Sequence, residues 1–404
     1  MRAVPGSHVT AARPGSTLSS VSKRDRDRFA FDVSIIVPTY NRAHFLAECL
    51  DALLAEVRPI DELIVVDDGS TDETLNVLSN YADRVIVLTT PNRGKAAALN
   101  LALERARCTL VWIVDDDDIV CKGALETLLA LFASCPGPDI VYGRHLRFIS
   151  QGRKAEPRIL GTGYWSDCDP ESFLIATLED LFVHHPGMIV RRSLYQEVGP
   201  FNEKLARSVD YDMLIRLARK GRVASTNAIV FHQRLHDGDR GPAKKRSVSA
   251  NRDAVWIDHD KTIFRAIYAD LPLSAYLPHR EVLTSEDHRR ALLQRGTIMA
   301  RKKLWTLAFR DFVAAPEQSG APLTHEECAI LRKATGSKYG CLEILSDPDI
   351  SLEMTALAQR SRLGKALVRA LARGLIWRIR RAALTLNFRE CLGLAVRVFQ
   401  WVRA

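Results

Sequence analysis

This chain of 404 residues lacks the segments that mark a membrane-spanning or secreted protein. No apolar stretch approaches the roughly 20 residues that a bilayer span requires. The first thirty residues contain no apolar core of a signal peptide. The eight cysteines include no Cys-x-x-Cys pair and no histidine at zinc-site spacing, so neither a disulfide framework nor a zinc site is indicated. We therefore expect a cytoplasmic protein with reduced cysteines.

The chain also lacks an even spread of positive charge, although its formal net charge is +9. Ten arginines and one lysine lie from Arg360 to the end, against the single acid Glu390, which leaves residues 1–359 with a net charge of −1. No aromatic platform or base-reading motif accompanies the basic residues, which disfavours nucleic acid as a partner. The basicity is a property of one tail.

Short apolar runs alternate with helical patterns over residues 31–245. The runs predict strands at 33–37, 63–66, 84–88, 110–114 and 139–142, with helices at 43–54, 70–80, 95–105 and 123–132 between them. The helix at 70–80 is expected to open with a Ser-x-x-Glu capping box. Strands that are apolar on both faces and alternate with helices predict an α/β fold, a mostly parallel sheet flanked by helices.

The remaining segments have a different character. Residues 1–30 are rich in Gly, Ser, Pro, Arg and Lys, and we expect them to be disordered. Beyond residue 245 the pattern is almost purely helical, with helices expected at 250–268, 285–312 and 324–334. We therefore predict a C-terminal helical domain at 246–356, followed by a basic amphipathic helical tail at 357–404.

Four consecutive carboxylates, Asp115 to Asp118, follow the predicted strand at 110–114. Carboxylate oxygens are hard ligands, and Mg²⁺ or Mn²⁺ held by one or two of them usually also holds substrate phosphates. Alternate side chains of a strand share a face, so we expect Asp115 and Asp117 to converge on one ion while Asp116 points elsewhere. The alternative is a plain acidic surface turn.

Other polar residues fall at the carboxyl ends of predicted strands, where parallel sheets bind ligands. Tyr40, after Pro38, offers a stacking surface for a base, and Asp68 offers acceptors for a ribose or a base edge. Lys95 opens a predicted helix, where a phosphate is attracted. These residues and the acidic run describe a pocket for a nucleoside diphosphate with a divalent ion. The alternatives are packing for Tyr40 and a simple turn around Asp68.

Four motifs in this order resemble the signature of family 2 glycosyltransferases. They are Val33-Ser-Ile-Ile-Val-Pro-Thr-Tyr-Asn41, Val65-Val-Asp-Asp-Gly-Ser-Thr-Asp72, Asn92-Arg-Gly-Lys-Ala-Ala-Ala-Leu-Asn100 and Val114-Asp-Asp-Asp-Asp118. The similarity covers about residues 32–240. It implies a GT-A fold and an enzyme that transfers a sugar from a nucleotide-sugar donor with inversion.

The resemblance also implies roles for individual residues. Tyr40 and Asp68 hold the base and Asp115 the ribose side of the donor, with Pro38 and Lys95 completing the donor site. Asp117 binds the metal, Mn²⁺ or Mg²⁺, that bridges the diphosphate. His236, in Arg234-Leu-His236, matches a late Arg-x-His element near the diphosphate or metal, although a lone histidine is also a common structural residue.

By the same resemblance Asp210 is the catalytic base, which removes the proton of the acceptor hydroxyl. The chain departs from the family's common Glu-Asp pair here, because Val209 stands in place of the glutamate. Asp210 lies at the start of a predicted helix, where the dipole favours the ionised carboxylate. The alternative is that Asp210 only caps that helix. We interpret His184 and His185 as lining the acceptor side.

The basic tail, residues 360–404, places arginines and leucines on opposite faces of a predicted helix. Such a helix can lie peripherally on an anionic membrane at its inner face, which would suit a lipid-linked acceptor. The alternative is that the leucine face docks on the helical domain and the arginines are merely solvated.

The function predicted is a metal-dependent, inverting transfer of one sugar to a glycan or lipid-linked acceptor. The Gln-x-x-Arg-Trp sequence of polymerising synthases in the resembled family is absent, which favours a single addition. A sugar nucleotidyltransferase is one rival, but its Gly-rich loop would stand where Pro38-Thr39-Tyr40-Asn41 is found. A catalytically inactive domain acting as a membrane or protein adaptor is the other.

Overall fold

The computed structural model describes residues 31–134, 137–150, 157–236 and 252–403, in two compact units. Unit 1 comprises the chain up to Pro170 together with Leu181–Ala250, and unit 2 comprises Glu171–Asp180 together with Asn251–Ala404. The tail at 1–30 and the boundary predicted at residue 245 lie outside the described residues.

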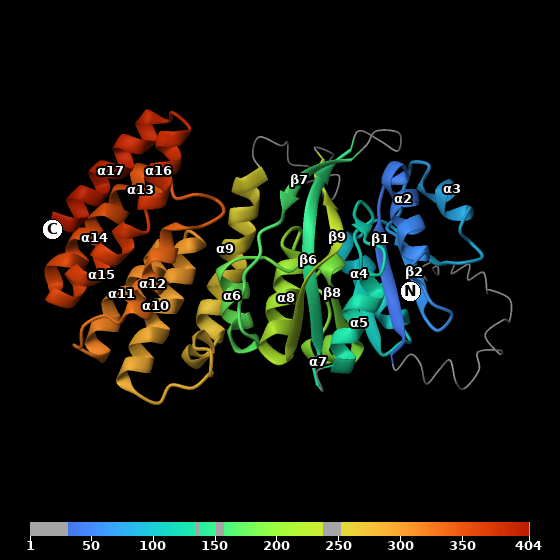
Figure 1. Ribbon diagram of the computed structural model, residues 1–404, viewed down its shortest axis with the longest axis horizontal. Coiled ribbons are helices and arrows are strands. Elements are labelled where there is room, and N and C mark those ends of the chain that lie inside the picture. The colour runs from blue at the N-terminus through green and yellow to red at the C-terminus, as the bar shows by residue number, and fades with distance from the viewer. Residues whose placement is uncertain (1–30, 135–136, 151–156, 237–251, 404) are drawn as a thin grey trace, which may run out of the picture. The chain divides into compact units, whose positions relative to one another are not determined.

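Unit 1 is built on a nine-stranded sheet in the order β3-β2-β1-β4-β8-β6-β9-β5, with β7 paired to β6 (Figure 1). The strands β1 to β4 run parallel to one another, as predicted, whereas β8 runs antiparallel to both β4 and β6. The strands are β1 (Val33–Thr39), β2 (Glu62–Asp67), β3 (Ile86–Thr89), β4 (Leu110–Ile113), β5 (Ile119–Val120), β6 (Ile140–Ile149), β7 (Arg158–Thr162), β8 (Met188–Arg191) and β9 (Val223–Arg234).

Helices cover both faces of this sheet, because its central strands are apolar on both sides and every residue of β1 and β4 is buried. Val33, Ile35 and Val37 of β1 pack in one core with Leu50 of α2 and Leu128 of α5, while α4 lies against β1 and β2. The helices of unit 1 are α2 (Ala43–Leu54), α3 (Thr74–Ser79), α4 (Lys95–Arg105), α5 (Ala124–Ser134), α7 (Arg192–Val198) and α8 (Val209–Lys220), with a 3-10 turn at His185–Gly187.

The capping box expected at Ser70 and Glu73 does not form. The side chain of Ser70 accepts a hydrogen bond from the backbone N–H of Asn41 (2.8 Å), and its own N–H donates to the carboxylate of Asp67. The helix α3 therefore starts later, at Thr74, whose N–H donates to Asp72 (3.0 Å). Tertiary hydrogen bonds that fix the strand ends have replaced the local cap.

Among the described residues of unit 2, all of the regular secondary structure is helical. A buried ion pair, Arg289 with Glu327 (2.8 Å), joins α10 to α12, and the Lys333 ammonium bonds to Glu179 (2.9 Å) at the end of α6. Its helices are α6 (Phe173–Glu179), α9 (Arg252–Asp270), α10 (Ser285–Arg301), α11 (Trp305–Gln318), α12 (His325–Arg332), α13 (Glu343–Ser346), α14 (Pro348–Arg360), α15 (Arg362–Arg373), α16 (Ile376–Leu384) and α17 (Phe388–Arg403), with 3-10 turns at Leu273–Tyr276 and Lys333–Thr335. The protein thus combines a mixed α/β sheet domain with a C-terminal helical region, as expected from the sequence.

The basic tail differs from the expected continuous helix, because it forms α15, α16 and α17. The division expected between residues 356 and 357 falls inside α14, and α15 packs on α12, α14 and α17. Leu367 and Leu371 of α15 are buried, so for this helix the leucine face is docked and the alternative reading of the tail holds. None of the described helices is long and apolar enough to cross a bilayer.

Candidate active site

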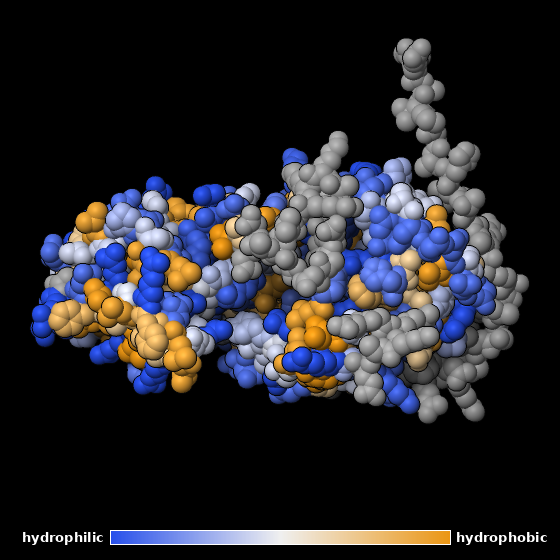
Figure 2. All heavy atoms as spheres, turned by 90° about the horizontal axis from the view of Figure 1, so that it is seen from above, coloured by the Kyte–Doolittle hydropathy of each residue, from blue (hydrophilic) through white to orange (hydrophobic). Residues whose placement is uncertain are grey.

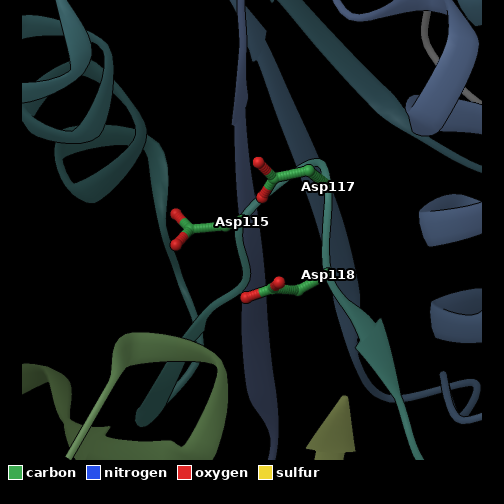
Figure 3. Close-up of side chains that lie close together, drawn as sticks. All are labelled: Asp115, Asp117 and Asp118. Atoms are coloured by element: carbon green, nitrogen blue, oxygen red, sulfur yellow. The ribbon is translucent and has the colours of Figure 1, made fainter. Parts of the chain in front are cut away.

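The acidic run lies in a turn after β4 and not in the strand itself, since β4 ends at Ile113. The N–H of Asp118 donates to the carbonyl of Asp115 (3.1 Å), which closes the turn. Carboxylate oxygens of Asp115, Asp117 and Asp118 lie within 4.8 Å of one another, and Figure 3 shows the three side chains extending from this one turn. The expected pair is therefore a trio, because a tight turn does not alternate as a strand does.

Asp116 does not belong to the trio of converging carboxylates. Its side chain is buried. Burial, and after it the charge of Asp117, raises the pKa of Asp116 to about 7.

The Arg-x-His element at the end of β9 holds the acidic turn in place. The buried guanidinium of Arg234 donates to the carbonyl of Asp117 (2.9 Å) and to the carboxylate of Glu48 (2.6 Å). Its backbone N–H donates to the Asp118 carboxylate (2.9 Å). The Nε2 atom of His236 lies 2.7 Å from Oδ2 of Asp117. The structure therefore brings His236 to the predicted metal ligand.

Asp68, the predicted base-binding residue, closes the loop that leads into α4. Its two carboxylate oxygens accept hydrogen bonds from the N–H groups of Arg93 (2.8 Å) and Gly94 (2.7 Å). Burial raises the pKa of Asp68 and outweighs these hydrogen bonds, which lower it. Each carboxylate oxygen still has a second lone pair for a ligand donor.

Pro38 and Tyr40 stand at the carboxyl end of β1, at the sheet edge that also carries Asp68. Pro38 is buried within the strand, in register with Val66 of β2, whereas Tyr40 is partly exposed just after the strand. Tyr40 is therefore available to a ligand, and Pro38 shapes the strand end beneath it.

Lys95 joins the acidic turn to the predicted base. Its ammonium bonds to Oδ1 of Asp115 (2.7 Å) and to Oδ2 of Asp210 (2.8 Å). Burial would lower the pKa of Lys95, but the charges of Asp115 and Asp210 outweigh it and raise that pKa. Residues 115 positions apart, Lys95 and Asp210, are thus brought together at one point.

Asp210 lies in the first turn of α8, but it is not the N-cap, which is Ser208. Its Oδ1 atom lies 3.3 Å from Nδ1 of the buried His185. Burial would raise the pKa of Asp210, but the charges of Lys95 and then His185 hold it well below its ordinary value. Asp210 therefore does not cap the helix, and the Lys95 ammonium favours its ionised carboxylate.

His185 is the contact that sequence reasoning missed. His185, which we expect to line the acceptor side, lies against Asp210, and Val209 beside Asp210 is buried. The departure from the Glu-Asp pair was the available signal, since it left the base without its usual neighbour. The second acid of α8, Asp212, bonds instead to Arg216 (2.8 Å), which holds the carbonyls of residues 198 and 199.

These residues suit a divalent cation. Asp115, Asp117 and Asp118 provide hard oxygen ligands and His236 a nitrogen ligand, which is a donor set used by Mn²⁺ and Mg²⁺ proteins. Like charges within 4.8 Å repel one another, and a bound cation relieves that repulsion.

Part of the sheet unit is similar to known proteins. Residues 34–199 match the family model described as "Glycosyl transferase family 2". The chain is 30% identical to the hyaluronan synthase of Pasteurella multocida over 230 residues, which are 56% of this chain and 22% of that protein. It is 32% identical to a chondroitin synthase of the same species over 216 residues, or 52% of this chain and 21% of that one. This chain therefore spans about a fifth of each synthase.

A solved structure supports the fold. The crystal structure of S. aureus TarS 1-349 superposes with a TM-score of 0.51 and covers 82% of this chain and 93% of that one. At 18% sequence identity, the likeness concerns the fold alone.

Proposed function

We propose that the protein moves one sugar from a nucleotide-diphosphate sugar to an acceptor hydroxyl, with inversion and with Mn²⁺ or Mg²⁺. The match of residues 34–199 to the glycosyl transferase family 2 model supports the class of reaction. One observation carries the proposal. Lys95 bridges Asp115 of the acidic turn and Asp210 of α8, so a donor site and a candidate base share one cation. Such an arrangement suits a reaction in which a diphosphate departs and a hydroxyl is deprotonated.

The donor occupies the carboxyl ends of the parallel strands in this proposal. Tyr40 stacks on the base and Asp68 accepts a hydrogen bond from it, with Pro38 below, and Asp115 contacts the ribose side. Asp117, Asp118 and His236 would hold the divalent ion together with Asp115, since their ligand atoms already converge. The bound ion supplies positive charge for the departing diphosphate.

Transfer with inversion needs a single displacement. The acceptor oxygen bonds to the anomeric carbon as the bond to the diphosphate oxygen breaks, and Asp210 takes the hydroxyl proton. A donor diphosphate would compete with Asp210 for Lys95. Loss of that contact raises the pKa of Asp210 and makes it a stronger base, so donor binding would prepare the base for the acceptor.

We propose a glycan or a lipid-linked sugar as the acceptor. Two relatives are named as synthases of hyaluronan and chondroitin, which supports a glycan acceptor. We also propose a reduced, cytoplasmic location, because the scattered cysteines of the sequence indicate no disulfide framework.

Asp210→Asn tests the base. We expect transfer to fall by about a hundredfold or more while nucleotide-sugar binding in the presence of Mn²⁺ persists, because Asn cannot take the proton. The matched control is Asp212→Asn on the same helix, which should keep most activity because Asp212 contacts Arg216 and not Lys95. Wild-type transfer by Asp210→Asn would refute the assignment. Donor binding without transfer in the wild-type protein would instead favour the inactive adaptor.

A further inference from the structure

The last two helices of the chain leave large apolar side chains in solvent. α16 and α17 pack together and are joined by residues 385–387. Leu384, Leu386, Phe388 and Leu392 are 85%, 72%, 70% and 68% exposed. Figure 2 shows hydrophobic residues gathered among hydrophilic ones on the surface of the helical unit, at the left of the view. We call the exposed residues the hairpin face: Ile376, Trp377, Leu384, Leu386, Phe388, Leu392, Val396, Phe399 and Val402.

The helix α17 carries two apolar stripes on opposite sides. Leu394 and Trp401 are fully buried and dock the helix on its unit. At about 100° per residue, Phe388, Leu392 and Phe399 fall on the other side of the helix. A helix that only needed to dock would present polar residues there, so the second stripe is available for another apolar environment.

Positive charge surrounds this face. Arg380, Arg381, Arg389 and Arg403 are all exposed, and Glu390 is the only acid in α16 and α17. The guanidinium of Arg403 lies 4.0 Å from the ring centroid of Phe399, so charge and apolar surface are directly adjacent. Arginine beside exposed leucine and phenylalanine is typical of helices that lie in an anionic lipid interface.

We propose that the hairpin face binds the surface of an anionic lipid bilayer, with its apolar side chains in the acyl boundary and its arginines among the headgroups. The positive charge of the hairpin face favours an anionic bilayer over a second copy of the chain. In a dimer formed through this face, the arginines of the two copies would repel one another. Each arginine near an anionic surface strengthens binding by about fivefold. The prediction of membrane contact made for residues 360–404 thus narrows to α16 and α17, because the apolar face of α15 is buried.

The consequence for function rests on the proposed transferase activity. An enzyme held at a bilayer meets a lipid-linked acceptor at the surface where that acceptor is anchored. Membrane binding itself needs neither donor nor catalysis, so Asp210→Asn should bind vesicles like the wild type. Failure of the proposed activity and failure of the membrane proposal therefore give separate results.

Vesicle sedimentation of the full chain tests the proposal. We expect binding to vesicles of phosphatidylcholine with phosphatidylglycerol, little binding to phosphatidylcholine alone, and weaker binding as salt is raised. The variant Leu384→Ser/Leu392→Ser should bind about tenfold or more weakly, as should Arg380→Gln/Arg381→Gln. The matched control is Leu283→Ser, since Leu283 is 79% exposed in the same unit but lies outside the hairpin face. Circular dichroism checks that each variant is folded.

Two results would overturn the proposal. One is equal binding of the wild type and the hairpin-face variants to anionic vesicles. The other is a dimer, measured by light scattering, that the same leucine substitutions dissociate in a chain that does not bind vesicles; the occupant would then be a second copy.

Discussion

Lys95 illustrates how one residue can serve two partners. Sequence reasoning assigned it to a donor phosphate, and the structure places its ammonium between the carboxylates of Asp115 and Asp210. Both assignments hold if the donor diphosphate, on binding, replaces the carboxylates of Asp115 and Asp210 at the Lys95 ammonium. The proposed mechanism therefore depends on the charge of Lys95 more than on its shape.

Lys95→Met should change the pH dependence of transfer as well as its rate. Burial, no longer outweighed by the lysine charge, raises the pKa of Asp210, so the base becomes protonated at low pH. We expect the acidic limb of the kcat/KM profile to shift to higher pH. The rate at pH 7 should fall by about a hundredfold, because the donor diphosphate loses its contact with Lys95.

Lys95→Arg is the matched control, because it keeps the charge and should leave the acidic limb near its wild-type position. An unshifted limb in Lys95→Met would show that Lys95 does not set the ionisation of the base.

The acidic turn allows a comparison between adjacent residues. Asp117→Asn and Asp118→Asn should each weaken Mn²⁺ binding by about tenfold or more, because each removes a charged ligand and keeps the side-chain size. Asp116→Asn is the control and should leave the affinity unchanged, because its carboxyl group is buried outside the trio. Isothermal titration calorimetry with Mn²⁺ measures all three. Equal losses in all three variants would mean that the run acts only through its summed charge.

Which site residues could be predicted from the sequence depends on whether regular secondary structure places them. The strand-end motifs around Tyr40, Asp68 and Asp115 were readable, because parallel strands bring their carboxyl ends to one edge. The contact of His185 with Asp210 was not, because it depends on how α8 approaches a 3-10 turn. The place of Asp118 beside Asp115 and Asp117 could not be predicted, because strand periodicity puts Asp118 on the opposite face and does not apply in a turn.

At the scale of elements, the first and last residues of a helix could be predicted where the local sequence pattern determines them. The helices α2 and α4 begin and end where the hydrophobic pattern placed them. The helix expected at 285–312 is divided, because residues 302–304 turn the chain and Lys303 adopts a left-handed conformation (φ 62°). No residue there is Gly or Pro, so composition gave no sign of the break.

The docking of α15 can be tested at Gly374, which follows it. A Cβ atom added there would lie 2.3 Å from the carbonyl oxygen of Arg332 and 2.6 Å from Oγ1 of Thr335. We expect Gly374→Ala to lower the free energy of unfolding by about 1–3 kcal/mol, because backbone must move to admit the methyl group.

Gly320→Ala is the matched control, since nothing lies within 4 Å of the added Cβ atom. Urea unfolding measures both. A loss in Gly374→Ala no larger than in Gly320→Ala would mean that the end of α15 is not tightly packed.

At the scale of the molecule, every candidate site residue belongs to unit 1 and the hairpin face belongs to unit 2. Mn²⁺ with a matching nucleoside diphosphate should therefore protect unit 1 selectively. A ligand at a hundred times its Kd stabilises the state that it binds by about 2.7 kcal/mol. Hydrogen exchange should slow in α4, the acidic turn and the start of α8, and stay unchanged in α10 to α12. Equal protection of both units would indicate a site not confined to unit 1.

The two roles of α17 limit how the chain can be shortened. Trp401, three residues before the end, is as deeply buried as the sheet core, so cutting away α16 and α17 would also strip apolar cover from α14 and α15. A shortened protein that precipitates or loses activity would then say nothing about lipids. Solubility is better sought by exchanging side chains on the outer stripe of α17, which leaves the inner stripe and the helix in place.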